Sequence, residues 1–387
     1  MEFIDLKSQQ NQLTPKGIPL REEIDKRIKS VLNHGRYILG PEVSELEHKL
    51  ANFVGVKYCV GVSSGTDALL IALMALGIKR GDEVITTPFS FFATAETIMI
   101  LGAIPVFIDI DKDTYNLDHN KLKSAITKKT KAIMPVSLYG QPANFLEINK
   151  IAEIYKIPVI EDGAQSFGAT HHNKRSCGLS TIGTTSFFPS KPLGGYGDGG
   201  ACFTNNCELA KKMRIISIHG QEKRYSHIKI GVNGRLDTIQ AAILLAKMEV
   251  FEKEVSERQK IAKRYSLELQ KAGFKFTPKT SEFNTSVFAQ YTIQTDNRDL
   301  VREKLKDKNI PTAIHYPSLI TNQQALNVNN SLTSRIYRKI LNKRLYLKKP
   351  LNNAENISKR VLSLPMHPLL TQNDQDKVIT SVLEALN

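Results

Sequence analysis

The segment Val159–Gln165 reads Val-Ile-Glu-Asp-Gly-Ala-Gln, and further along the chain Ser186–Gly195 reads Ser-Phe-Phe-Pro-Ser-Lys-Pro-Leu-Gly-Gly. The first segment is an apolar strand that ends in a carboxylate, and the second is a strand that is followed by a lysine. Ligands of open α/β sheets bind at the carboxyl ends of strands. The two segments therefore predict an α/β fold with a ligand site near Asp162 and Lys191.

An amine and a carboxylate in this order suit an enzyme that holds pyridoxal phosphate as a Schiff base. Lys191 would condense with the cofactor aldehyde, and Asp162 would keep the pyridine nitrogen protonated so that the ring accepts electrons. Taken alone, each residue also fits an ordinary role, since a lysine after a strand is usually solvated and an aspartate before glycine is often a turn residue. The combination favours the cofactor site.

Length and composition describe a globular protein of two domains. A chain of 387 residues exceeds the size at which one core keeps growing, so we expect a large domain over residues 1–245 and a small C-terminal domain over 246–387. Hydrophobic content is 41%, and no apolar run approaches the ~20 residues that span a bilayer. The N-terminal residues lack the features of a signal peptide. A cytoplasmic protein without a membrane partner is expected.

The formal net charge is +15, which is compatible with nucleic-acid binding. However, the lysines are spread along the chain, and the basic run at 128–131 is too short for a binding arm. We therefore expect solvated lysines and no nucleic-acid partner, with some of the charge serving an anionic small-molecule substrate. The four cysteines show no C-x-x-C spacing, so neither a metal site nor a disulfide framework is predicted.

Short apolar runs alternate with helical patterns from Tyr58 to Thr204. This rhythm predicts a mostly parallel sheet of seven strands near residues 58–62, 83–87, 105–109, 132–136, 157–161, 183–188 and 200–204. A long helix is expected over 239–269, followed by a smaller α+β domain with a strand at 290–294 and a helix at 298–308. The Asn-rich stretches at 322–330 and 352–356 are expected to be surface loops.

Two further segments lie where a cofactor would be bound. Ser63–Leu69 follows a strand and opens an apolar helix, so its backbone N–H groups could bind a phosphate, although the same pattern is typical of a capping box. Pro88–Ala95 places phenylalanines directly after a strand, and one of these rings could stack on the pyridine. The alternative for these rings is core packing.

An ordered series of segments resembles the DegT/DnrJ/EryC1/StrS sugar aminotransferases over nearly the whole chain. Its members are Gly-Pro-Glu-Val at 40–43, Ser-Ser-Gly-Thr-Asp-Ala at 63–68, Gly-Asp-Glu-Val-Ile at 81–85, Ala-Thr-Ala-Glu at 93–96, Leu-Tyr-Gly-Gln-Pro-Ala at 138–143, Glu-Asp-Gly-Ala-Gln at 161–165, 186–195, and Gly-Asp-Gly-Gly-Ala at 197–201. The resemblance implies the fold type I of pyridoxal-phosphate-dependent transferases, with helices on both sides of the sheet and a smaller α+β C-terminal domain.

The resemblance also implies roles for individual residues. Lys191 would form the Schiff base, Asp162 would pair with the pyridinium nitrogen, and Gln165 would hydrogen-bond the phenolic oxygen of the cofactor. The cofactor phosphate and ring would be held by Gly65, Thr66, Ser186 and Phe91, and by Asn233 of a partner subunit. A site shared in this way implies a homodimer.

The substrate is indicated by a finer likeness to the 3-oxo-uronate branch of the same family, carried by the N-terminal residues and by 174–177, 187–192 and 311–317. It implies transfer of the amino group of L-glutamate to the 3-keto carbon of a UDP-2-acetamido-2-deoxy-3-oxo-uronate, in O-antigen (lipopolysaccharide) synthesis. Many relatives carry an aromatic residue where this chain has Gly234, which would leave room beside the substrate. Arg235 is a candidate for the sugar carboxylate, and His315 and Tyr316 are further candidates for the sugar site.

Three alternatives stay open at this point. The first is an aminotransferase for a dTDP- or GDP-linked 6-deoxy keto sugar. The second is a sugar dehydratase of the same fold, but such relatives typically replace the Schiff-base lysine with histidine, and this chain has Lys191. The third is a regulatory protein without catalysis, which the retention of Lys191, Asp162 and Gln165 together disfavours.

Overall fold

The computed structural model describes residues 1–327 and 350–386. A central sheet runs in the order β3 (Ile104–Phe107), β2 (Glu83–Thr86), β4 (Thr130–Ile133), β5 (Ile160–Asp162), β8 (Ile182–Ser186), β9 (Gly200–Thr204) and β1 (Tyr58–Val62). Parallel bridges from Ile133 to Val159 and from Val136 to Asp162 join its two halves. The seven predicted strands are confirmed, with shifts of a few residues at their ends.

The prediction of a mostly parallel sheet is also confirmed. β9 runs antiparallel to both of its neighbours, β1 and β8, whereas the pairings of β2 with β3, β2 with β4 and β5 with β8 are parallel. The carboxyl ends of the parallel strands therefore meet at one edge of the sheet. Asp162 is the last residue of β5, and Ser186 is the last residue of β8, the neighbouring strand.

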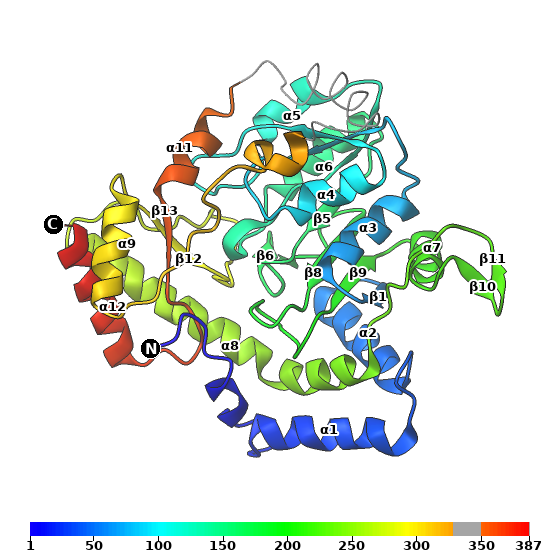
Figure 1. The fold of residues 1–387 in the computed structure, drawn as a ribbon, viewed down its shortest axis with the longest axis horizontal. Helices are drawn as coiled ribbons and strands as arrows, with labels where there is room; N and C mark the ends of the chain where they lie inside the picture. The colour runs from blue at the N-terminus through cyan, green and yellow to red at the C-terminus, as the bar shows by residue number, and fades with distance from the viewer. Residues whose placement is uncertain (328–349, 387) are drawn as a thin grey trace.

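Helices cover both faces of the sheet (Figure 1). They are α2 (Pro41–Val54), α3 (Gly65–Ala75), α4 (Ala93–Ile100), α5 (His119–Ala125), α6 (Phe145–Ile154), α7 (Cys207–Ser217) and α8 (Thr238–Lys271). α3 is apolar on almost every side, because it packs between the sheet and α7 in one hydrophobic cluster. α2 and the first half of α8 form a second cluster against the other side of the sheet.

The long helix α8 continues into a second core. Its later residues, among them Ile261, Tyr265 and Leu269, pack with the small C-terminal layer. This layer contains β12 (Tyr291–Gln294) paired antiparallel with β13 (Val361–Leu364), together with α9 (Arg298–Asp307), α11 (Asn352–Arg360) and α12 (Gln372–Leu386). The predicted strand, the helix after it and the α+β character are confirmed. The domain boundary at residue 245 falls inside α8 and stays a prediction.

The expectation of a surface loop at 352–356 was wrong, because these residues begin α11. Asparagine is a poor helix former, but the backbone N–H groups of Asn353 and Ala354 donate to the buried carboxylate of Asp109 at 3.0 and 2.9 Å. A cap from a distant residue therefore starts this helix. The other predicted loop contains the short 3-10 turns η3 (Ile320–Asn322) and η4 (Gln324–Asn327), and its last three residues, 328–330, lie outside the described residues.

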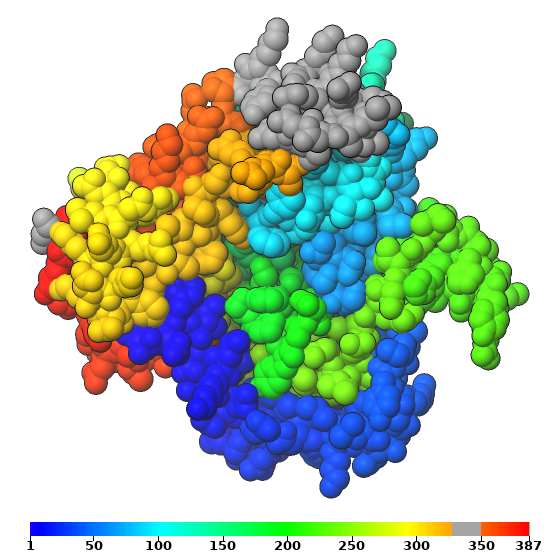
Figure 2. All heavy atoms as spheres, viewed as in Figure 1, coloured from blue at the N-terminus to red at the C-terminus, as the bar shows by residue number. Residues whose placement is uncertain are grey.

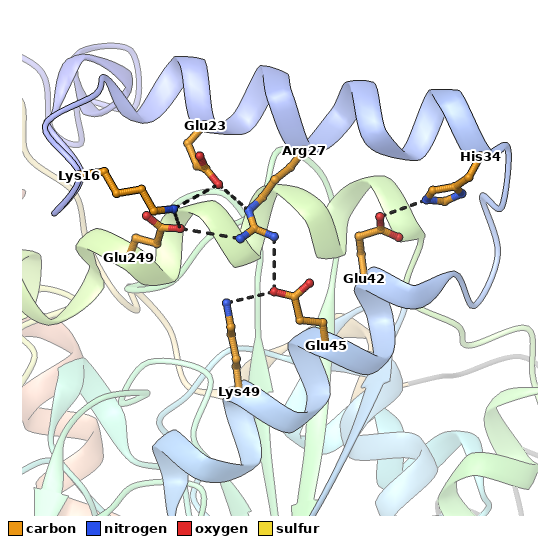
Figure 3. A network of polar contacts seen from close by, with 8 residues as sticks. All are labelled: Lys16, Glu23, Arg27, His34, Glu42, Glu45, Lys49 and Glu249. Carbon is orange, nitrogen blue, oxygen red and sulfur yellow. Dashed lines mark hydrogen bonds and ion pairs between the residues drawn. The ribbon is translucent and has the colours of Figure 1, made fainter.

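The helix α1 (Leu20–His34) is held against α8 and α2 by a polar network (Figure 3). Arg27 is its centre, with nitrogens 3.0 Å from Glu23, 3.5 Å from Glu45 and 3.7 Å from Glu249. Single exposed ion pairs contribute little, but a guanidinium shared by three carboxylates fixes the packing of three helices. Apolar contacts of Leu20 and Ile24 with α8 lie beneath this network.

A two-stranded hairpin projects from the body of the molecule next to α7 (Figures 1 and 2). It consists of β10 (Gln221–Lys223) and β11 (Ser226–His227), and Tyr225, Ile228 and Ile230 beside it are 80%, 51% and 86% exposed. A second small ladder joins β6 (Thr170–His171) and β7 (Lys174–Arg175). Within the residues described, no helix is long and apolar enough to cross a membrane.

Candidate active site

Asp162 lies at the end of β5 and is buried. Its Oδ2 accepts a hydrogen bond from Thr94 Oγ1 at 2.9 Å, and its Oδ1 accepts from the backbone N–H of Ala164 at 3.3 Å. Burial raises the pKa of this carboxyl, while the two hydrogen bonds and the charge of Lys191 act in the opposite direction. A buried carboxylate with fixed donors on both oxygens is suited to pairing with one cationic ring nitrogen.

Lys191 lies in the turn after β8, where its backbone N–H donates to the carbonyl of Phe188 at 2.8 Å. Burial lowers the pKa of its ammonium group, and the charge of Asp162 offsets part of that change. A lower pKa increases the fraction of free amine, which is the form that attacks a carbonyl. The structure thus brings the two residues of the predicted pair within electrostatic reach of each other.

Gln165 is held in one orientation by a buried backbone group. The N–H of Tyr139 donates to Gln165 Oε1 at 2.8 Å, so the amide nitrogen points the other way and donates to the hydroxyl of Tyr316 at 3.1 Å. A side-chain amide fixed at its oxygen can present only N–H groups to a ligand. Gln165 is therefore a donor in this site, as a phenolate oxygen requires.

The segment that carries His315 and Tyr316 belongs to the small C-terminal layer and reaches the same site. His315 Nδ1 lies 3.0 Å from Ser363 Oγ of β13, and its carbonyl accepts a hydrogen bond from the hydroxyl of Tyr139. Burial, and after it the charge of Lys191, lower the pKa of His315 to about 4. The imidazole is therefore neutral near pH 7. Burial and the charge of Asp162 raise the pKa of Tyr316.

Aromatic rings line this region. Phe91 is 57% exposed and its ring centroid lies 6.3 Å from that of Tyr316, whereas Phe89 is fully buried and meets Tyr316 edge-on at 6.4 Å. The two phenylalanines therefore differ in what their rings can contact. Phe89 packs in the core, and Phe91 is the ring that is available to stack on a ligand.

The N-terminus of α3 lies against the end of β8. Ser64 caps the helix by accepting from the N–H of Asp67 at 3.0 Å, which confirms that this segment is a capped helix start. A Cβ on Gly65 would lie 2.6 Å from Ser186 Cβ, so only glycine lets the first turn, which includes Thr66, approach that strand. The free N–H groups of the first turn and the Ser186 hydroxyl then form an anion-binding corner.

Asn233, Gly234 and Arg235 form an extended segment beside β1. The carbonyl of Gly234 accepts from the N–H of Ser63 at 3.1 Å, and Arg235 bridges to Val62. Asn233 is exposed, whereas Nε of Arg235 is buried and has no hydrogen-bond partner within the described part of the chain. A Cβ on Gly234 would lie 3.0 Å from both Ile71 and Val232. Close packing against these two side chains is one reason for glycine at this position, and the room expected beside a substrate stays a prediction.

Two contributors were not assigned from the sequence. Thr94 orients Asp162, and Tyr139 orients Gln165. Both stand inside segments that carried the family resemblance, at 93–96 and 138–143, so their position in those segments was an available signal. Tyr139 also has a φ of 57°, a left-handed conformation that is uncommon for a tyrosine.

Pyridoxal phosphate fits the residues present. The corner of α3 and Ser186 would hold its phosphate, Asp162 would pair with its pyridine nitrogen, Gln165 would donate to its phenolic oxygen, Phe91 would stack on its ring and Lys191 would bind its aldehyde. The close approach of Gly65 to Ser186 supports this fit, because a Cβ at residue 65 would collide with Ser186 and push the N-terminus of α3 away from the end of β8. The set is consistent in charge and hydrogen-bonding capacity with that one cofactor.

Comparisons with known proteins agree with this geometry. The model of the DegT/DnrJ/EryC1/StrS aminotransferase family matches residues 19–383. The chain is 54% identical over 370 residues to a UDP-2-acetamido-2-deoxy-3-oxo-D-glucuronate aminotransferase of Pseudomonas aeruginosa, with 96% of each chain covered. It is also 41% identical to a pleiotropic regulatory protein of Geobacillus stearothermophilus, covering 99% of this chain and 97% of that one.

Solved structures share the fold. The crystal structure of ntda from Bacillus subtilis with bound cofactor PMP superposes with a TM-score of 0.86 at 32% identity, covering 100% of this chain and 85% of that one. The similarity confirms the prediction of fold type I.

Proposed function

The chain belongs to the DegT/DnrJ/EryC1/StrS aminotransferase family, and we propose that it transfers the amino group of L-glutamate to the 3-keto carbon of a UDP-2-acetamido-2-deoxy-3-oxo-uronate. It is a pyridoxal-phosphate-dependent aminotransferase. The observation that carries the proposal is that buried Asp162 ends β5 while Lys191 lies in the turn after the adjacent strand β8, close enough for the two charges to affect each other's pKa. The choice of sugar is supported by the 54% identity to the Pseudomonas aeruginosa enzyme of that name.

The cofactor, when bound, supplies an aldehyde that takes up an amino group and a ring that accepts electron density. The residues of the chain orient the cofactor and transfer protons. Asp162, fixed by Thr94, holds a proton on the pyridine nitrogen. Gln165, fixed by Tyr139, donates to the phenolic oxygen. The amine of Lys191 removes a proton from the α-carbon of glutamate and returns one to the cofactor's C4′ carbon.

The second half of the reaction uses the same groups in reverse. Lys191 would move the proton from the cofactor carbon to the former keto carbon of the sugar, and its amine would then displace the new sugar amine from the cofactor carbon. The low pKa of His315, about 4, makes its imidazole a weak proton acceptor, so it does not compete with Lys191 for that proton. His315 and Tyr316 approach from the small C-terminal layer and are proposed to contact the sugar.

A uronate substrate carries a carboxylate in addition to its diphosphate. Arg235 is proposed to bind this carboxylate, because its Nε is buried and has no hydrogen-bond partner among residues 1–327 and 350–386. An unpaired buried guanidinium nitrogen is costly unless a ligand satisfies it, and a carboxylate matches the geometry of the group. The apolar packing around Gly234 fixes the position of the neighbouring Arg235 backbone.

The enzyme is proposed to act as a homodimer with shared sites. Several large apolar side chains are exposed: Tyr37 by 48%, Ile38 by 53% and Phe188 by 50%. The projecting β10–β11 hairpin adds Tyr225, Ile228 and Ile230. Apolar surface of this extent marks an interface, and Asn233 follows the hairpin in sequence. We expect Asn233 to complete the phosphate corner of the partner subunit.

The enzyme is proposed to act in the cytoplasm, in the synthesis of O-antigen.

The proposal is tested with a panel of keto nucleotide sugars. Purified holoenzyme is incubated with L-glutamate and, in separate reactions, a UDP-linked 3-oxo-uronate and dTDP- or GDP-linked 6-deoxy keto sugars, and the products are identified by mass. Amination of the uronate with little turnover of the 6-deoxy sugars supports the proposed substrate. The opposite preference rejects that substrate and leaves the aminotransferase assignment in place.

A further inference from the structure

A crevice of about 400 Å³ lies at the boundary between the two layers and contains none of the residues of the candidate active site. One wall comes from the segment after β3, with Lys112, Asp113 and Tyr115. The other wall comes from the small C-terminal layer, with Lys275, Lys279 and Arg360. A cavity of this size is within the range of sites that bind small molecules.

The crevice has a net positive charge, even when Asp296, which pairs with Arg360 from outside the lining, is counted with Asp113. Asp113 is the one acidic residue in its lining, against Lys112, Lys275, Lys279 and Arg360. Asp113 accepts a hydrogen bond from Lys279 at 2.7 Å and from Lys112 at 3.1 Å, so one negative charge is shared by two ammonium groups. Within the described parts of the chain, Lys275 has no carboxylate within 4 Å. An excess of cations in a concave space attracts an anion.

Arg360 is held more firmly than an ordinary surface arginine. Its guanidinium lies 4.9 Å from the centre of the Phe276 ring, its Nε is 2.8 Å from Asp296 Oδ1, and its side chain is only 18% exposed. Nε is close to Asp296 but has no hydrogen-bond partner among the described residues, and the planar guanidinium is suited to a bidentate contact with an oxyanion. A guanidinium that is already fixed loses little entropy when a ligand binds.

Contacts between the two walls connect this crevice to the active site. Gln294 Nε2 donates to the hydroxyl of Tyr115 at 3.0 Å, which joins the small layer to the large one. The ring of Tyr115 lies 5.4 Å from that of Tyr139, whose N–H fixes Gln165. A ligand that contacts both walls would therefore stabilise the arrangement in which Tyr139 holds the active-site glutamine.

We propose that this crevice binds a small multivalent oxyanion, bearing phosphate or carboxylate groups, and that the bound anion holds the two layers together. Arg360 provides the oriented contact, and Lys275, Lys279 and Lys112 provide the surrounding positive charge. This site is independent of the proposed sugar substrate.

The test is calorimetric titration of the holoenzyme with inorganic pyrophosphate and, separately, with citrate, at low ionic strength. Lys275→Gln removes one charge and breaks no ion pair among the described residues, so it is expected to fold normally. Lys128→Gln is the matched control, because Lys128 is exposed, lies outside this crevice, and has no ion pair in the described chain. The melting temperature of each variant checks folding.

The expected result is saturable binding of at least one of the two anions, weakened about tenfold or more by Lys275→Gln and unchanged by Lys128→Gln. The anion that binds identifies phosphate or carboxylate as the preferred group. The proposal is overturned if neither anion binds saturably, or if the two lysine variants weaken binding equally. It is also overturned if Arg235→Ala abolishes binding while Lys275→Gln does not, because the anion then occupies the substrate site.

Discussion

The hydroxyl of Thr94 donates to Oδ2 of Asp162 at 2.9 Å, across 68 positions of sequence. Thr94 itself is completely buried and its Oγ1 lies 3.0 Å from Ser90 Oγ, so the hydroxyl is fixed before any ligand binds. This hydrogen bond favours the ionised form of a carboxyl group whose pKa burial raises. Thr94 is therefore a positioning residue for the proposed cofactor pairing.

Thr94→Ala is expected to lower kcat by about tenfold to a hundredfold, because a hydrogen bond to a charged group contributes roughly 1.5–3 kcal/mol. Thr94→Ser keeps the hydroxyl and should retain most of the activity. The absorbance of bound cofactor as a function of pH should shift in the alanine variant and return in the serine variant. Equal activity of all three proteins would show that Asp162 does not depend on Thr94.

Borohydride treatment of the holoenzyme should fix the cofactor on Lys191 and on no other lysine. Lys247 is the useful internal control, since burial lowers its pKa to about 8, yet it lies on α8 against Tyr196 and outside the proposed site. Peptide mapping distinguishes the two lysines. Lys191→Ala should still bind pyridoxal phosphate through the other contacts and lose transamination by several orders of magnitude. An adduct mapped to Lys247 would contradict the assignment.

Shared sites predict complementation between inactive subunits. Lys191→Ala and Asn233→Ala protomers should each be strongly impaired, and mixing them should restore activity because each heterodimer contains one site with both residues intact. Subunit exchange is verified independently with differently tagged chains. Without recovery after exchange, Asn233 would serve the site of its own chain.

Arg235→Ala should raise KM for the uronate by a factor corresponding to roughly 2 to 4 kcal/mol, which is the scale of losing a buried charge-assisted pair. The first half-reaction with glutamate should change far less. Arg235→Lys should recover only part of the loss, since an ammonium group cannot make the bidentate contact. A similar increase in KM for a keto sugar without a carboxylate would contradict this role.

The stability of the protein should fall on acidification from about pH 6.5 to about pH 4, in part because of His315. Its pKa is lowered from 6.5 to about 4, so in this window the unfolded chain binds a proton that the folded protein excludes. The contribution is at most about 3 kcal/mol. His315→Asn should flatten the dependence of the melting temperature on pH in this window. An unchanged slope would show that His315 titrates normally.

Much of the fold follows from local sequence. Strands such as β1 and β8 are runs of buried residues between turn signals, and α8 is a long periodic segment, so both kinds of element were predictable. The start of α11 was not, because its cap is the carboxylate of Asp109, more than two hundred residues earlier in the chain. Long-range caps leave no local signal.

The candidate site also has a part that local sequence predicts and a part that depends on distant residues. Asp162, Lys191 and Gln165 were identified from their segments, but the groups that orient them come from other elements. Thr94 reaches Asp162 from α4, and Tyr139 reaches Gln165 from the turn after β4, and both contacts depend on strand order. The packing of Gly234 against Ile71 of α3 was likewise not predictable from sequence, because the two residues are far apart in the chain and meet only in the folded protein.

The central claim is tested most directly by following the nitrogen itself. Holoenzyme is incubated with nitrogen-labelled L-glutamate and UDP-2-acetamido-2-deoxy-3-oxo-glucuronate, with Lys191→Ala as the control, and the nucleotide sugar is analysed by NMR and mass spectrometry. The label should appear as an amine at the C3 position of the sugar with the wild-type protein and be absent with Lys191→Ala. Label that stays in glutamate in the presence of bound cofactor, or equal transfer by both proteins, would contradict the account.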